Sequence, residues 1–144
     1  MTSPLDNLAR ISKGGLKAEP PSRSEIEGLL RSARRRLADA RTPSLSVESV
    51  FDLTYNAAHA YALAALRWHG YRSDNRYLVF QALPHTLGFP AAKWRVLDLC
   101  HNKRNLAEYE GYFDVDPRLV ADLLAIAGEL ELAVDKLVGK GSAP

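Results

Sequence analysis

Apolar residues recur at intervals of three and four along most of this chain, and this spacing limits the fold more than any other feature. After Asp116 and Pro117, two such apolar rows run side by side along the last expected helix. An apolar face of this width is typical of a helix that contacts more than one neighbour. No segment shows the sustained alternation of a half-buried strand. The pattern predicts an all-α, up-down bundle of about five helices. The two rows consist of Leu119, Leu123, Ile126, Leu130, Ala133 and Leu137, and of Val120, Leu124, Ala127, Val134 and Val138.

Four helices are expected before this last one. Ser24 and Glu27 form a capping-box pattern at the start of the first helix. The second helix is rich in alanine, which permits close approach of its neighbours. Pro84 should interrupt the third helix, and Gly88 should close it. The expected helices span residues 24 to about 40, 46–70, 77–88 and 90–111.

The start of the chain differs from the rest. Residues 1–22 contain Gly14–Gly15, Pro20–Pro21 and few periodic apolar positions. We therefore expect a mobile N-terminal arm, with one short helical turn around residues 5–11. Residues 23–139 should form the bundle and residues 140–144 a flexible tail. With 144 residues, the chain is long enough for one good core and too short for two.

Composition excludes several classes of function. The net charge is only +2, so any contact with nucleic acid must be local. The single cysteine excludes an internal disulfide, and the four histidines lack the spacing of a metal site. We expect no metal and no cofactor. No apolar run approaches the ~20 residues that cross a bilayer, and no signal peptide is evident, so a cytoplasmic protein is expected.

Two groups of polar residues in the expected helices have ordinary structural explanations. The basic run Arg31, Arg34, Arg35 and Arg36 is distributed around a helical turn and is typical of a solvated face. Contact of this run with nucleic acid is the alternative. His59 lies among the alanines of the second helix, where a histidine at the edge of the packing is expected.

Residues 100–111 place a polar cluster in the expected fourth helix. Arg104 falls on the apolar stripe of that helix, where a charge must find a partner. Its neighbours at helical spacing are side chains of the types used in phosphate binding and proton transfer. A simple ion pair between Arg104 and Glu108 is the alternative. The cluster consists of His101, Arg104, Asn105, Glu108 and Tyr109.

Four segments, taken in their order and spacing, resemble the HEPN superfamily. The resemblance covers about residues 24–138. It is closest to the small bacterial branch with an Arg-x-x-Ala-acidic-Tyr pattern in the fourth helix, matched here by Arg104, Ala107, Glu108 and Tyr109. The four segments are Tyr55–Ala60, Leu66–Arg72, Leu83–Gly88 and Arg104–Glu110.

This resemblance implies a HEPN-like helical bundle that forms a homodimer. Many HEPN proteins are metal-independent RNases or toxins that are paired with a minimal nucleotidyltransferase antitoxin, so RNA and such an antitoxin are the implied partners. The active family motif is an arginine followed by a histidine. Arg104 and Asn105 match its start, but Tyr109 stands where the histidine is expected. In some pairs the antitoxin modifies a tyrosine two residues beyond that histidine; Gly111 holds that position here, with Tyr112 beside it.

Cleavage of RNA without a metal requires a base, an acid and a cation near the phosphorus. Arg104 supplies the cation, and Asn105 can orient a phosphate. Tyr109, with an ordinary pKa near ~10, is a poor base. His101 lies one turn before Arg104 and is the candidate base. Two functions stay open at this point: an RNase or toxin component, and a non-catalytic dimeric interaction or nucleic-acid-binding module with a degenerate motif.

Overall fold

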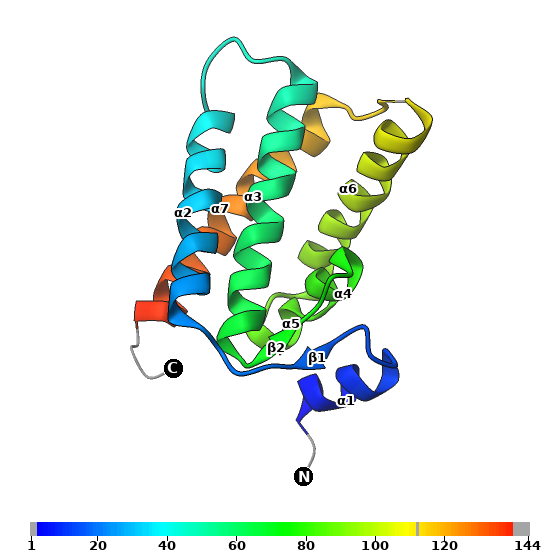
Figure 1. Ribbon diagram of the computed structural model, residues 1–144. Coiled ribbons are helices and arrows are strands. Elements are labelled where there is room, and N and C mark those ends of the chain that lie inside the picture. The colour runs from blue at the N-terminus through cyan, green and yellow to red at the C-terminus, as the bar shows by residue number, and fades with distance from the viewer. Residues whose placement is uncertain (1–2, 112, 140–144) are drawn as a thin grey trace.

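The computed structural model describes residues 3–111 and 113–139, and it confirms the predicted all-α bundle. The central helix α3 (Val47–Trp68) packs most extensively against α2 (Arg23–Ala40) and α7 (Pro117–Gly139). The long helix α6 (Ala91–Glu110) lies on the other side of α3 from α2 (Figure 1). The short helices α4 (Arg76–Gln81) and α5 (Leu83–Thr86) connect α3 to α6.

Alanine makes α3 the centre of the core. All six alanines between residues 57 and 65 are at most 4% exposed, as the prediction of close packing requires. Larger side chains of α2 and α7, including Leu37, Leu123 and Leu130, fill the space beside them and are fully buried. One contiguous apolar cluster therefore links the elements of the bundle.

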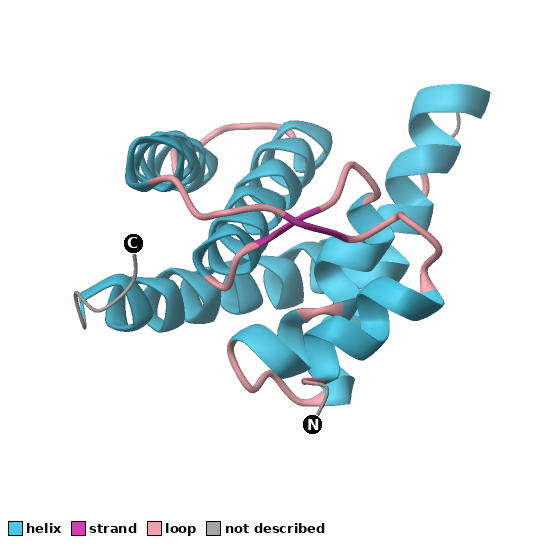
Figure 2. Ribbon diagram, turned by 60° about the horizontal axis from the view of Figure 1, so that its bottom comes forward, coloured by secondary structure: helices cyan, strands magenta, loops and turns pink. Residues whose placement is uncertain are grey.

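The N-terminal segment is part of this folded body, which corrects its assignment as a separate arm. Helix α1 (Pro4–Ile11) coincides with the expected short helical turn, and its Leu5 and Leu8 are buried with Leu16 in the main cluster. The following strand β1 (Lys17–Ala18) pairs antiparallel with β2 (Tyr71–Arg72), as Figure 2 shows. This segment has no helical periodicity, because three spaced leucines and backbone contacts hold it in place and a continuous amphipathic helix does not.

The N-cap of helix α2 lies two residues earlier than the capping-box pattern predicted. The side chain of Ser22, not of Ser24, accepts a hydrogen bond, from the backbone N–H of Glu25 at 3.3 Å. Ser24 and Glu27 are exposed. The earlier start is explained by tertiary contacts, because it brings the carboxylate of Glu25 to two arginines described below.

The other helix ends agree closely with the sequence. Ser46 caps α3 by accepting from the N–H of Ser49. The third expected helix is divided at Ala82 into α4 and α5, with Pro84 in the first turn of α5, and Gly88 has a positive φ of 70°. Gly111 adopts the left-handed conformation that ends α6. Residues 140–144, the expected tail, lie outside the described residues.

Among the described residues, no helix combines the length and the apolar character needed to cross a membrane.

Candidate functional site

The centre of the candidate site is Tyr55, a fully buried residue of α3. The guanidinium carbon of Arg104, on α6, lies 5.3 Å from the centroid of the Tyr55 ring, and that of Arg76, on α4, lies 5.5 Å from it. These distances allow cation–π attraction to the ring. Three helices thus bring two cations to one aromatic side chain. Sequence analysis missed Tyr55 and Arg76, because helical spacing carries no information about which helices are neighbours.

His101 lies against the same tyrosine. Its Nδ1 is 2.9 Å from the hydroxyl of Tyr55, and its Nε2 is 3.3 Å from the amide nitrogen of Asn105. Burial lowers the pKa of His101; the carboxylate of Asp98 opposes this shift, and the two nearby guanidinium groups add to it. The imidazole is therefore neutral near pH 7, with both ring nitrogens in polar contacts.

His59 lies one turn of α3 beyond Tyr55 and packs edge-on against Phe80, with ring centroids 6.0 Å apart. Its partial exposure confirms the expected position at the edge of the packing. Burial, together with the positive charges of Arg76 and Arg104, lowers the pKa of His59 to about 3. Both histidines of this face are consequently held in the neutral form.

Arg104 lies as the sequence predicted, partly along the apolar face, with its side chain 23% exposed. It also makes the simple ion pair with Glu108, at 2.8 Å. Its Nε is buried and has no hydrogen-bond partner among the described residues. Arg104 therefore keeps hydrogen-bonding capacity that its ion pair does not use.

On its other side, Arg104 borders an open groove of about 440 Å³ between α3 and α6. The rim carries three carboxylates and this single guanidinium, so the groove disfavours an anion. The groove is lined by Glu48, Ser49, Phe51, Asp52, Arg104, Ala107, Glu108 and Phe113.

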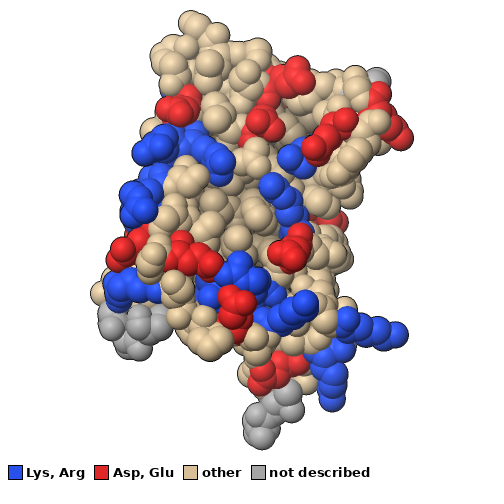
Figure 3. All heavy atoms as spheres, in the orientation of Figure 1, with Lys and Arg blue, Asp and Glu red and all other residues tan. Residues whose placement is uncertain are grey.

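The remaining predicted site residues are not part of this arrangement. Tyr109 is 79% exposed and lines a shallow hollow on the outer side of α6 with Leu106. Tyr112 lies outside the described residues. In the basic run of α2, Arg34 pairs with Asp135 at 2.5 Å, while the flanking arginines are exposed. Figure 3 shows basic side chains over α2 and again between α3 and α6, mixed with acidic ones.

A second arginine, Arg67, is far more buried than Arg104 and was also missed. Its side chain is 1% exposed, and its guanidinium donates to three backbone oxygens. These are the carbonyls of Pro20 at 2.8 Å, Glu19 at 3.1 Å and Tyr71 at 3.2 Å. Its Nε donates to the carboxylate of Glu25. Every nitrogen of the group has a partner, so Arg67 joins the N-terminal segment to α3 and has no free donor for a ligand.

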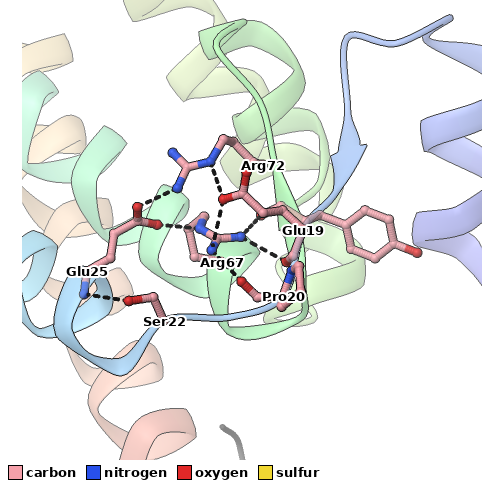
Figure 4. Close-up of polar contacts among 7 residues, drawn as sticks. Glu19, Pro20, Ser22, Glu25, Arg67 and Arg72 are labelled. Carbon is pink, nitrogen blue, oxygen red and sulfur yellow. Dashed lines mark hydrogen bonds and ion pairs between the residues drawn. The ribbon is translucent and has the colours of Figure 1, made fainter.

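Arg72 completes this cluster. It pairs with Glu19 at 2.6 Å and with Glu25, so each of the two carboxylates bridges Arg67 and Arg72 (Figure 4). Burial raises the pKa of Glu25, but the hydrogen bonds from the two arginines outweigh that effect, and the pKa is lowered. We refer to Glu19, Glu25, Arg67 and Arg72 as the ion-pair cluster. Its role is structural.

Among residues 3–111 and 113–139, no three histidine, cysteine or acidic side chains are grouped to hold a metal ion. Cys100 is buried, and burial raises the pKa of its thiol to about 12. In the comparisons with known proteins, no family model matches the chain and no curated protein matches it.

Proposed function

We propose that this chain is a HEPN-like protein that binds a phosphate of RNA or of a nucleotide at an Arg104-centred site. In this proposal the protein is a homodimer whose two sites face a common cleft. It acts as one component of a HEPN/nucleotidyltransferase toxin–antitoxin-type pair. The family assignment rests on the resemblance of the four segments named above.

One observation carries the phosphate site: two guanidinium groups, from different helices, lie within 5.5 Å of the Tyr55 ring beside a neutral histidine and an amide. Guanidinium groups bind phosphate through directed, charge-assisted hydrogen bonds. Arg104 has a buried Nε without a partner among the described residues, so its donors are not all engaged. Asn105 can contribute an amide donor next to it.

The first experiment is to incubate the purified protein with a mixed pool of tRNA and mRNA, without added metal, and to measure both binding and cleavage. We expect binding that falls as salt rises, since phosphate contacts release counterions. Arg104→Ala should abolish most of it. Arg95→Ala is the matched control, because Arg95 is an exposed arginine of the same helix and should bind RNA like the unchanged protein. Equal RNA binding by all three proteins would refute the site.

A second candidate function, a non-catalytic dimeric interaction module, is favoured by a different observation. Helix α6 exposes apolar side chains on its outer side: Leu99 is 46% exposed, Leu106 37% and Tyr109 79%. Exposed apolar residues on one helix face are typical of an interface. Sedimentation of Leu106→Glu against Leu132→Glu tests this, because Leu132 is 71% exposed on α7. Loss of a dimer only in Leu106→Glu, together with no RNA binding by the unchanged protein, supports this function, and a monomeric unchanged protein excludes it.

A further inference from the structure

The hydroxyl of Tyr55 is in hydrogen-bond contact with one ring nitrogen of His101. The hydroxyl is buried with the rest of the side chain and lies 2.9 Å from His101 Nδ1. Burial raises the pKa of the Tyr55 phenol, and the positive charge of the nearby Arg76 opposes this effect without reversing it. Tyr55 therefore keeps its proton. Among the described residues His101 Nδ1 is the only hydrogen-bond partner of this hydroxyl, so the phenol donates its proton to that nitrogen.

The acceptor for that proton is His101 Nδ1. A neutral imidazole carries one proton, so occupation of the Nδ1 lone pair places the ring proton on Nε2. Nε2 lies 3.3 Å from the Asn105 amide, whose oxygen can take the position next to Nε2 by a half-turn of the amide group. The chain of donors then runs from Tyr55 to His101 and from His101 to Asn105.

We infer that Tyr55 is a positioning residue that holds His101 as the Nε2–H tautomer, so that His101 fixes the Asn105 amide beside a phosphate and does not act as a general base. This inference rests on the proposed function, because it concerns the same phosphate site. It replaces the candidate base of the sequence analysis with a donor. A base needs a free lone pair, and the lone pair of His101 is bound to Tyr55.

The remaining charges of the site agree with this role. His101 is flanked by Arg76 from α4 and by Arg104 from its own helix, with Asp98 one turn before it. The cations disfavour a second proton on the ring, so the imidazole stays neutral. The site then offers two guanidinium groups and the N–H donors of the Asn105 amide to an anion. It binds a phosphate diester of RNA and leaves the 2′-hydroxyl protonated.

The test is a two-bond ¹H–¹⁵N correlation spectrum of the histidine rings in the full chain at pH 7. His101 should show an unprotonated Nδ1 and a protonated Nε2, and its signals are assigned by their loss in His101→Gln. In Tyr55→Phe the ring is kept and the hydroxyl is lost, so we expect His101 to shift toward a mixture of both tautomers. Tyr61→Phe is the matched control, since Tyr61 is a buried tyrosine of the same helix whose hydroxyl bonds Glu131 instead, at 2.7 Å.

A protonated Nδ1 in the unchanged protein would overturn the inference, and this measurement needs no variant to fold. An unchanged His101 tautomer in folded Tyr55→Phe would overturn it as well. RNA cleavage that disappears in His101→Gln would assign His101 a base and contradict the donor role. The spectra need no RNA, so an Nε2–H tautomer in a protein that binds no RNA would refute the proposed function alone.

Discussion

Two arginines of this bundle, Arg67 and Arg104, both leave the apolar side of a long helix, yet their surroundings differ. Arg67 is 1% exposed, and each of its nitrogens is bonded to a carbonyl or a carboxylate. Arg104 is 23% exposed, makes one ion pair and lies against an aromatic ring, with its Nε unpaired among the described residues. The comparison teaches that an arginine whose guanidinium nitrogens all have hydrogen-bond partners has a structural role. An arginine with a nitrogen that lacks a partner can bind an anion.

The largest expected effect is on stability and comes from Arg67. Arg67→Ala would leave three backbone carbonyls without their donor and two carboxylates with only Arg72. Removing one partner of a buried ion pair costs about 3–5 kcal/mol, so we expect a loss of that size in the free energy of unfolding. Urea denaturation followed by circular dichroism measures it. A loss below ~1 kcal/mol would contradict the structural role.

The second effect depends on pH and concerns His59, which faces Arg36 from α2, Arg76 from α4, and His101 and Arg104 from α6. Its folded pKa of about 3 lies below the ordinary value of 6.5, so the unfolded chain binds the proton first as the pH falls. His59 therefore contributes stability above pH 6.5 that is lost progressively toward pH 3, by at most about 1.4 kcal/mol for each pKa unit.

The variant His59→Gln cannot titrate and should lose less stability than the unchanged protein between pH 6.5 and pH 4. Urea denaturation at several pH values measures the difference. His85→Gln is the matched control, because it makes the same substitution at an exposed histidine of α5. Identical pH dependence in His59→Gln and the unchanged protein would show that His59 is not held neutral.

A third, smaller effect on stability is expected at the start of α2, where replacing Ser22 should cost more than replacing Ser24. Ser22 caps the helix beside the ion-pair cluster, so Ser22→Ala should lower the free energy of unfolding by about 1 kcal/mol. Ser24 is exposed on the first turn, so Ser24→Ala should change it by less than ~0.5 kcal/mol. Thermal unfolding of the two variants compares them directly. A larger loss of unfolding free energy in Ser24→Ala than in Ser22→Ala would show that Ser24 caps the helix, as the capping-box pattern predicted.

The sequence predicted the bundle and most helix ends because those depend on local spacing and on capping residues. It also placed His101, Arg104, Asn105 and Glu108 on one helix surface, where the structure has them. It missed Tyr55 and Arg76, since their meeting with α6 is a contact between helices. These residues lie 46 and 25 positions from His101, beyond any helical spacing.

Arg67 could have been noticed from the sequence. It follows a stretch of α3 in which alanines and leucine occupy every face, so its helix end is buried all round. A charge in such a place needs a partner, as does any buried charge. The sequence gives no indication of which carboxylates provide it. Glu19 lies in the segment before α2, which lacks helical periodicity, and Glu25 lies in the first turn of α2.

The smallest effect on stability is expected for Arg104. Its ion pair with Glu108 is of the i,i+4 type, worth about 0.2–0.5 kcal/mol, so Arg104→Ala should lower the free energy of unfolding by no more than ~0.5 kcal/mol. If Arg104 contacts a phosphate, the same variant should bind RNA more weakly and reduce the slope of log affinity against log salt by about 1. Urea denaturation and RNA titration at several salt concentrations measure the two quantities on one preparation. A loss of stability close to that of Arg67→Ala, with an unchanged salt slope, would make Arg104 a second structural arginine, and the distinction between the two clusters would no longer hold.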